Sequence, residues 1–387
     1  MTDVSQVNSQ YASILPGSII GLLGGGQLGR MFALAARRMG YRIHVLDPVS
    51  DSPAGQVCDQ EYHVPYDDLV SVEKFACETH VITFEFENIP SATLSALEAL
   101  RPVRPDARVL RICQNREREK AFLSAQGYPL PAYRVVDSPV SLRNAVLDLG
   151  FPCVLKTADF GYDGKGQLKI EKDEDWKTIW LKFNAPHAVV ETWVDFQQEI
   201  SIVCARGIDG TLKTYPVSEN IQNHHILDYS IVPARLDHHI QLEVEMLARS
   251  ITEALKVVGL LAIEFFLTRE GQILVNELAP RPHNSGHFTV DACVTSQFEQ
   301  QLRAVCGLPL GSTALLSPVV MVNLLGDLWK SGTPDWKRLL SEPFARLHLY
   351  GKSQPRKGRK MGHYCILSDD VEIALDKALT LRSLIQE

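Results

Sequence analysis

The chain has 387 residues, of which 45% are hydrophobic and 22% charged, and its formal net charge is −7. This length predicts two or three domains with ordinary cores, and the acidic balance argues against a general nucleic-acid-binding protein. We expect no signal peptide and no membrane span, because the first 16 residues are polar and no apolar run is long enough. The eight cysteines form no Cys-x-x-Cys pair, so we expect reduced thiols in a cytoplasmic protein.

The N-terminal region, after a loose tail at 1–16, is typical of a parallel strand–helix–strand unit. An apolar strand at 18–23 enters the turn Gly24-Gly25-Gly26-Gln27-Leu28-Gly29-Arg30, a helix follows at 30–39, and a second strand covers 41–46. A strand at 81–84, a helix at 91–100 and the proline-rich segment 101–105 close a Rossmann-like domain expected over 17–105.

The glycine turn in this region also fits the dinucleotide-binding fingerprint. Gly24, Gly26 and Gly29 have the required spacing, and Asp47 ends the second strand. An NAD-dependent oxidoreductase is therefore a rival function, and a plain strand–helix turn is the simpler interpretation.

The middle region, expected over 106–308, contains a second glycine-rich loop. A single polar helix is predicted at 106–126, and a strand at 151–157 leads into the loop 161–167, after which a strand returns at 168–171. A loop between two strands caps an antiparallel hairpin, so it is not a P-loop, which precedes a helix. Its backbone N–H groups can close over a triphosphate, with Lys156 on the phosphates; an ordinary flexible hairpin is the alternative.

Further along, runs at 188–194 and 199–205, an amphipathic helix near 240–257 and a hairpin at 261–278 are predicted. If Glu270-Gly271 is a two-residue turn, Arg269 pairs with Gln272, and counting outward places Glu264 opposite Glu277. Two opposed carboxylates between apolar neighbours repel each other unless a cation lies between them, and Mg²⁺ fits best. The alternative is one exposed glutamate and one paired with an arginine such as Arg281.

The C-terminal region, expected over 309–387, is a small domain of short strands with a closing helix from about 369. Its turn at 352–360 concentrates five cations between strands at 347–350 and 363–367. We interpret this turn as a phosphate-monoester site; the alternative is a solvated hairpin tip.

Five motifs in order resemble the ATP-grasp superfamily and, within it, the 5-(carboxyamino)imidazole ribonucleotide synthases. The similarity covers about residues 17–367, and its motifs lie at 24–30, 83–88, 161–167, 276–287 and 358–363. It implies an α/β (α+β) fold with a Rossmann-like N-terminal domain, a central ATP-grasp domain and a small β-rich C-terminal domain. It also implies ATP- and bicarbonate-dependent carboxylation of 5-aminoimidazole ribonucleotide through carboxyphosphate, in purine biosynthesis.

The resemblance also implies site residues. Glu264 and Glu277 match the ligands of Mg²⁺, with Mn²⁺ as an alternative metal. The ATP site would comprise Arg116, Lys156, Gly161, Tyr162, Asp163, Gly164, Lys165, Gly166, Gln167, Glu191, Thr192, Trp193, Val194, Glu199, Asn276 and Glu277. The ribonucleotide would contact Gln27, Leu28, Glu85, Tyr162, Asp163, Arg281, His283, Asn284, Lys352 and Arg359, the last two on its 5′-phosphate.

For the chemistry, Lys156 would support phosphoryl transfer, and Asp163 or His283 would orient the substrate amine and accept its proton. A homodimer is expected from the family. Two positions depart from related patterns: Ala279 stands where many ATP-grasp enzymes have an asparagine, and Gln222 where family members often have a histidine, so Gln222, His224 and His225 are left unassigned. The nearest rival activity is a formate-dependent glycinamide ribonucleotide formyltransferase.

Overall fold

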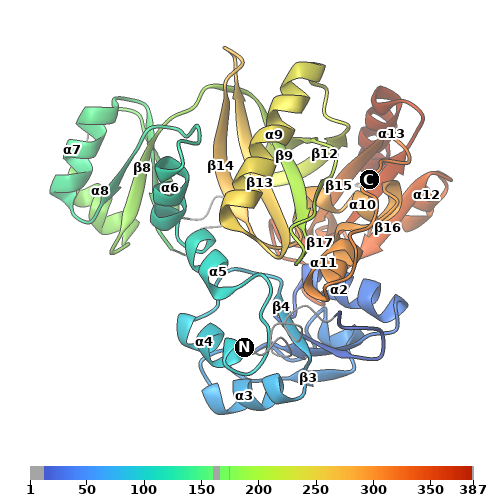
Figure 1. The fold of residues 1–387 in the computed structure, drawn as a ribbon. Helices are drawn as coiled ribbons and strands as arrows, with labels where there is room; N and C mark the ends of the chain where they lie inside the picture. The colour runs from blue at the N-terminus through green and yellow to red at the C-terminus, as the bar shows by residue number, and fades with distance from the viewer. Residues whose placement is uncertain (1–12, 160–165, 174, 386–387) are drawn as a thin grey trace.

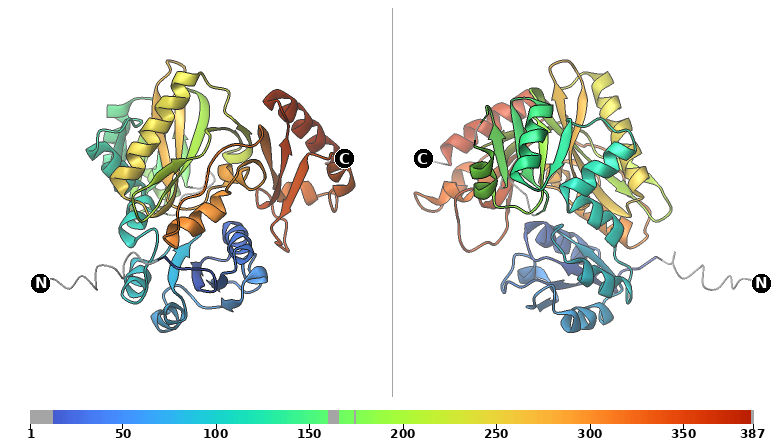
Figure 2. Two further views of the ribbon diagram at one scale, coloured as in Figure 1. Left: turned by 45° about the vertical axis from the view of Figure 1, so that its right-hand side comes forward. Right: turned by 90° about the vertical axis from the view of Figure 1, so that its left-hand side faces the viewer.

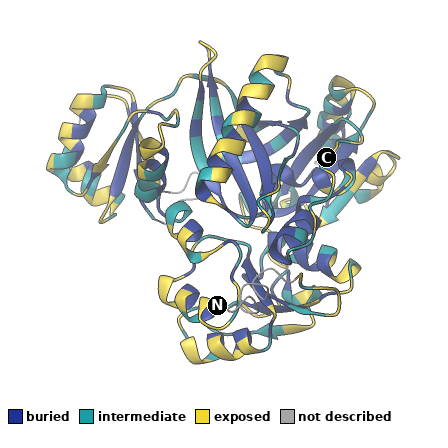
Figure 3. Ribbon diagram, viewed as in Figure 1, coloured by how far each residue is buried: buried dark blue, intermediate teal, exposed yellow. Residues whose placement is uncertain are grey.

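The computed structural model describes residues 13–159, 166–173 and 175–385, which form three β-sheets with their covering helices (Figure 1). In the view of Figure 1 the N-terminal sheet lies at the bottom, a small antiparallel sheet at the left, and a large sheet spans the centre and right. Most residues of the central strands are buried, whereas several edge strands and the outer faces of the covering helices are partly exposed (Figure 3). Among the residues that the structure describes, no helix is long and apolar enough to cross a membrane.

The N-terminal sheet confirms the parallel strand–helix–strand unit. Its order is β3-β2-β1-β4, and all its pairings are parallel. Helix α2 begins at Gln27, three residues earlier than predicted, because extended Gly26 is already its N-cap. The elements are β1 (Ile19–Leu23), α2 (Gln27–Arg38), β2 (Arg42–Leu46), η1 (Gly55–Val57), β3 (Gln60–Tyr62), α3 (Leu69–Cys77), β4 (Val81–Phe84) and α4 (Ser91–Glu98).

The single helix predicted at 106–126 is wrong: two helices occupy this stretch, α5 (Ala107–Cys113) and α6 (Arg116–Ala125). Asn115 breaks them because its backbone is extended and its side chain caps α6 by accepting from the Arg118 N–H. The Arg116 N–H then donates to the Ala158 carbonyl at 2.8 Å, which fixes the start of α6 beside the small sheet.

The small sheet has the order β5-β8-β6-β7 and is antiparallel throughout. Lys156 pairs with Gln167 across β6 and β7, so the predicted hairpin is confirmed, although residues 160–165 of its loop lie outside the described residues. Helices α7 and α8 pack on this sheet (Figure 2). The elements are β5 (Tyr133–Val136), α7 (Pro139–Leu149), β6 (Cys153–Thr157), β7 (Gln167–Ile170), α8 (Trp176–Phe183) and β8 (Ala188–Thr192).

The large sheet has the order β14-β13-β9-β11-β12-β15-β17-β16, with β10 beside β9. Its first strands and α9 enclose the largest apolar cluster, while α13 packs on the C-terminal strands. The elements are β9 (Phe196–Arg206), β10 (Leu212–Thr214), β11 (Ser218–Asn223), β12 (Ile226–Val232), α9 (His238–Leu255), β13 (Gly259–Thr268), β14 (Ile273–Ala279), η2 (Asn284–Gly286), α10 (Thr289–Ala292), α11 (Gln297–Val305), β15 (Val319–Leu325), η3 (Gly326–Trp329), α12 (Trp336–Leu340), β16 (Ala345–Leu349), β17 (Lys360–Leu367) and α13 (Val371–Leu384).

The C-terminal strands join the same sheet as the middle region, because β15 pairs antiparallel with β12. The domain limits given above stay predictions. The described end of the expected tail is anchored: the Ile14 N–H donates to the Cys306 carbonyl at 2.8 Å, and Tyr41 Oη donates to the Ile14 carbonyl at 2.7 Å. All eight cysteines are free thiols and five are buried, as expected for reduced thiols.

Candidate active site

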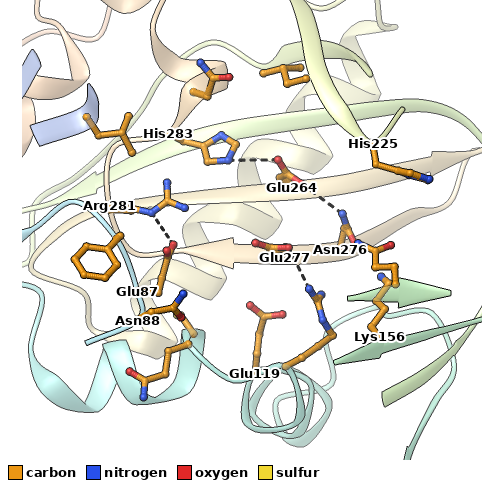
Figure 4. Close-up of a pocket in the computed structure, with 18 of the residues that line it drawn as sticks. Glu87, Asn88, Glu119, Lys156, His225, Glu264, Asn276, Glu277, Arg281 and His283 are labelled. Carbon is orange, nitrogen blue, oxygen red and sulfur yellow. Dashed lines mark hydrogen bonds and ion pairs between the residues drawn. The ribbon is translucent and has the colours of Figure 1, made fainter. Parts of the chain in front are cut away.

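A pocket of about 470 Å³ opens where the N-terminal domain, the small sheet and the large sheet meet (Figure 4). The structure brings together in it residues predicted separately for ATP, for metal and for substrate. The predicted residues that line it are Gln27, Leu28, Glu85, Arg116, Lys156, Gln167, Glu199, Glu264, Asn276, Glu277, Arg281, His283 and Asn284. The predicted residues Gly161, Tyr162, Asp163, Gly164 and Lys165 lie outside the described residues.

The glycine turn at the N-terminus of α2 is filled by a carboxylate of the protein itself. Glu85, just after β4, accepts from the Gly26 N–H with one oxygen and from the Gly29 N–H at 2.7 Å with the other. A Cβ on Gly26 would lie 2.3 Å from Glu85 Oε1, and Gly24 has a φ of +96°. The glycines therefore leave room for the Glu85 carboxyl group, which takes the place that a dinucleotide phosphate would need.

The predicted pair of Glu264 and Glu277 is confirmed, but by a different register. The turn pairs Leu267 with Ile273, so the predicted pairing of Arg269 with Gln272 is wrong. Asn276 is an extra residue on β14, and this bulge shifts the register so that Glu264 again faces Glu277.

The two carboxylates face the pocket together (Figure 4). Burial, and next the charge of Glu277, raise the pKa of Glu264 to about 8. Asn276 donates to Glu264 at 3.4 Å, while its own buried Oδ1 has no hydrogen-bond partner among the described residues. Oxygen atoms of this kind suit a hard divalent cation that takes its remaining ligands from phosphates and water. No group of three or more His, Cys, Asp or Glu side chains suited to a metal occurs in the described part of the chain.

Basic residues flank the carboxylate pair on the side of the small sheet. Arg116 Nη2 lies 3.6 Å from Glu277 Oε2, so Glu277, and not the neighbouring Glu264, has the arginine partner. Lys156 Nζ donates to Glu191 Oε2 at 2.9 Å, and the fully buried Lys120 lies 3.5 Å from the other oxygen of Glu191. Burial lowers the pKa of Lys156. Lys156 and Lys120 share the single carboxylate of Glu191, so these three side chains together keep a net positive charge that suits an anionic ligand.

Arg281 and His283 lie on the opposite side of the pair (Figure 4). The ion-pair partner of Arg281 is Glu87, whose Oε1 lies 2.7 Å from Arg281 Nε, and not Glu264 or Glu277. His283 Nε2 lies 3.4 Å from Glu264 Oε1, and burial lowers the pKa of His283 to about 3, so its ring is neutral.

Glu199 and Gln222 lie on adjacent strands at another wall of the pocket. Burial raises the pKa of Glu199 to about 7, and a hydrogen bond from Gln222 opposes the rise. Gln222 thus contacts Glu199, the residue predicted to bind the ribose. His225 lines the same wall from the β11–β12 turn, where His224 and His225 both have positive φ, +50° and +63°.

The basic turn lies between β16 and β17 as predicted, but Lys352 and Arg359 do not line the pocket. Lys352 Nζ donates to Gln27 Oε1 and to the Lys360 carbonyl, both at 2.7 Å, which links this turn to α2. Arg359 donates to the Gln354 carbonyl at 2.8 Å. Lys360, the last of the five cations at 352–360 but not one of the assigned site residues, lines the pocket.

Five predicted ATP residues do not line the pocket: Gly166, Glu191, Thr192, Trp193 and Val194. Of these, Glu191 contacts the lining residue Lys156. Sequence reasoning missed Glu87, Glu119 and Lys120. Burial raises the pKa of Glu119 to about 8, and Glu119 accepts from the Leu278 N–H at 2.9 Å. Glu119 and Lys120 lie in a charged stretch that resembles a solvated helix face, so nothing in the sequence indicated a site role. Glu87 lies within the 83–88 motif, which could have indicated it.

Known proteins match the chain over nearly its whole length. The ribonucleotide synthetase preATP-grasp domain matches residues 18–114, the ATP-grasp domain 121–298, and the phosphoribosylaminoimidazole carboxylase C-terminal domain 319–377. N5-carboxyaminoimidazole ribonucleotide synthase of Bacillus subtilis is 47% identical over 90% of this chain and 91% of its own. The chain belongs to the N5-carboxyaminoimidazole ribonucleotide synthase family.

Solved structures agree with this membership. An N5-carboxyaminoimidazole ribonucleotide synthetase in complex with ADP is 46% identical, with a TM-score of 0.90 over 96% of this chain and 97% of that one. The Aspergillus clavatus N5-carboxyaminoimidazole synthase, solved with ADP and 5-aminoimidazole ribonucleotide, is 28% identical, with a TM-score of 0.88 over 95% and 98%. The predicted α/β architecture is confirmed, and the oxidoreductase alternative is wrong. The glycine turn of this synthase family member holds Glu85 in place of a cofactor phosphate.

Proposed function

We propose that this chain uses ATP and bicarbonate to carboxylate the exocyclic amine of 5-aminoimidazole ribonucleotide, a step of purine biosynthesis. The observation that carries the proposal is the position of the carboxylate pair. Glu264 and Glu277 lie in one pocket between Lys156 on one side and Arg281 and His283 on the other (Figure 4). One cation at this pair would therefore face both a nucleotide and a second substrate.

The ATP half-reaction transfers the γ-phosphoryl group to a bicarbonate oxygen and gives carboxyphosphate and ADP. We propose that Glu264 and Glu277 hold Mg²⁺, or Mn²⁺ in its place, which when bound neutralises the phosphate charge. Arg116 and Lys156 would contact the phosphates, a step that requires Lys156 to exchange part of its contact with Glu191. Glu199 would accept hydrogen bonds from the ribose hydroxyls.

The second half-reaction joins the substrate amine to the carboxyl carbon, and phosphate leaves. Gln27, Glu85 and Asn284 would form the substrate wall, and Lys352 and Arg359 would bind the 5′-phosphate after rotating from their present partners. Asp163 and His283 remain the proposed groups that orient the amine, and the loop at 161–167 would cover the reaction. We also propose a cytoplasmic homodimer, on the basis of the family resemblance and the free thiols.

An ADP-release assay tests this function with each acceptor and each one-carbon donor. ADP formation should require 5-aminoimidazole ribonucleotide and bicarbonate together, and formate should not replace bicarbonate. Equal turnover with glycinamide ribonucleotide and formate would favour the formyltransferase instead and reject the proposal.

A further inference from the structure

A line of buried hydrogen bonds runs from the centre of the large sheet to the ring of His283. Ser230 Oγ donates to Asn220 Oδ1 at 2.8 Å, and Asn220 Nδ2 donates to Ser201 Oγ at 2.8 Å. Ser201 Oγ lies 2.7 Å from Ser285 Oγ, which lies 2.8 Å from His283 Nδ1. The three serines and the asparagine are all buried and come from four elements, β12, β11, β9 and η2.

The direction of these hydrogen bonds follows from the chemistry of the groups. The amide nitrogen of Asn220 can only donate, so Ser201 Oγ accepts from it and passes its own hydrogen to Ser285 Oγ. Ser285 Oγ then has its single hydrogen available for His283 Nδ1. The Ser285 backbone N–H also points at Nδ1, at 3.4 Å.

These contacts favour one position for the hydrogen on the His283 ring. Two donors converge on Nδ1, so Nδ1 is an acceptor and the hydrogen of the neutral ring is on Nε2. Nε2 faces the pocket beside Glu264 (Figure 4). The nitrogen that meets a ligand is therefore an N–H group with no lone pair for a proton.

We infer that Ser285, Ser201 and Asn220 are positioning residues that hold His283 as an Nε2–H hydrogen-bond donor. This inference rests on the proposed function and changes the role of His283 within it: in place of orienting the amine, its N–H would bind an oxygen of the carboxyl group being transferred. In that step the amine nitrogen forms a bond to the carboxyl carbon, and the bond from this carbon to the phosphate oxygen breaks. The amine proton goes to the phosphate released in the same step, and not to His283.

Substitutions at His283 separate a donor from a base. The side-chain amide of glutamine can place an N–H donor close to the position of Nε2, yet it accepts no proton at neutral pH. His283→Gln should therefore keep kcat within about tenfold of the wild type, whereas His283→Ala should lose roughly a hundredfold or more. Equal loss in both variants would overturn the donor role.

Nitrogen NMR of the full chain labelled in histidine tests the positioning residues without relying on turnover. The wild type should show a proton on Nε2 of His283 and none on Nδ1. Ser285→Ala should populate the other tautomer and lower kcat by roughly tenfold, the equivalent of one hydrogen bond, while the KM for ATP stays unchanged. Thr252→Ala is the matched control, because its buried hydroxyl donates to the Ala248 carbonyl away from this line of hydrogen bonds.

A proton on Nδ1 in the wild type, or an unchanged tautomer in Ser285→Ala, would overturn the inference. The tautomer is measured in the absence of substrate, so this result is independent of which acceptor the enzyme carboxylates. Failure of the proposed function would instead appear as absent ADP release with 5-aminoimidazole ribonucleotide in the wild type.

Discussion

Glu264→Gln and Glu277→Gln should both abolish ADP formation, yet only the second should destabilise the metal-free protein. Each variant loses one proposed Mg²⁺ ligand and relieves the repulsion between the two carboxylates. Glu277→Gln also removes the partner of Arg116, whose side chain is only 9% exposed. Breaking a fully buried ion pair costs about 3–5 kcal/mol, but the Glu277 side chain is 40% exposed, so water screens the pair and we expect about 1–2 kcal/mol.

The assay is urea denaturation of both variants in chelator, followed by ADP release at saturating magnesium. Glu264→Gln should unfold at or above the wild-type urea concentration, since within the described residues no arginine or lysine forms an ion pair with Glu264, and burial already raises its pKa. Equal destabilisation of the two variants would refute the role of Arg116. Near-normal ADP formation in either variant would refute the metal assignment.

Three further outcomes are expected. Because Glu199 must ionise to accept both ribose hydroxyls and its pKa is raised to about 7, the KM for ATP should fall as pH rises to about 7 and then level off; Glu199→Gln should remove this dependence in steady-state titrations. Lys352→Ala and Arg359→Ala should raise the KM for the ribonucleotide roughly ten- to a hundredfold with little effect on the KM for ATP. An unchanged ribonucleotide KM in both variants would show that this turn is a solvated hairpin tip and not a phosphate site. His225→Gly and its control His224→Gly should both raise the melting temperature, because glycine adopts a positive φ without strain. Only His225→Gly should also raise the KM for ATP, because it removes a side chain that lines the pocket.

The hairpin shows how far sequence alone defines the site. The hairpin was predicted at 261–278, and its opposed glutamates were correctly placed although the turn was wrong by one residue. The bulge at Asn276 compensates that error. A bulge inserts one residue without any distinctive composition, so counting from a turn cannot detect it.

Residues whose role depends on distant partners were beyond sequence reasoning. Lys120 looks like part of a solvated helix, yet it is fully buried because Glu191 and the Asn276 carbonyl, far along the chain, surround it. A lysine is almost never fully buried unless it is paired, and the pairing is visible only after folding. The break at Asn115 was missed for a related reason, since an asparagine within a polar run fits a helix and a cap alike.

The pairing of β12 with β15 has a practical consequence for dissecting this enzyme. Removal of the chain after about residue 309 would leave β12 as an edge strand with unpaired N–H and C=O groups along Tyr229 to Val232. Such an edge is a template for pairing with another chain, so the truncated protein should self-associate. The isolated C-terminal fragment would expose the matching edge of β15. Functional complementation therefore requires that both pieces be produced together, with the cut placed in the connection between α11 and β15.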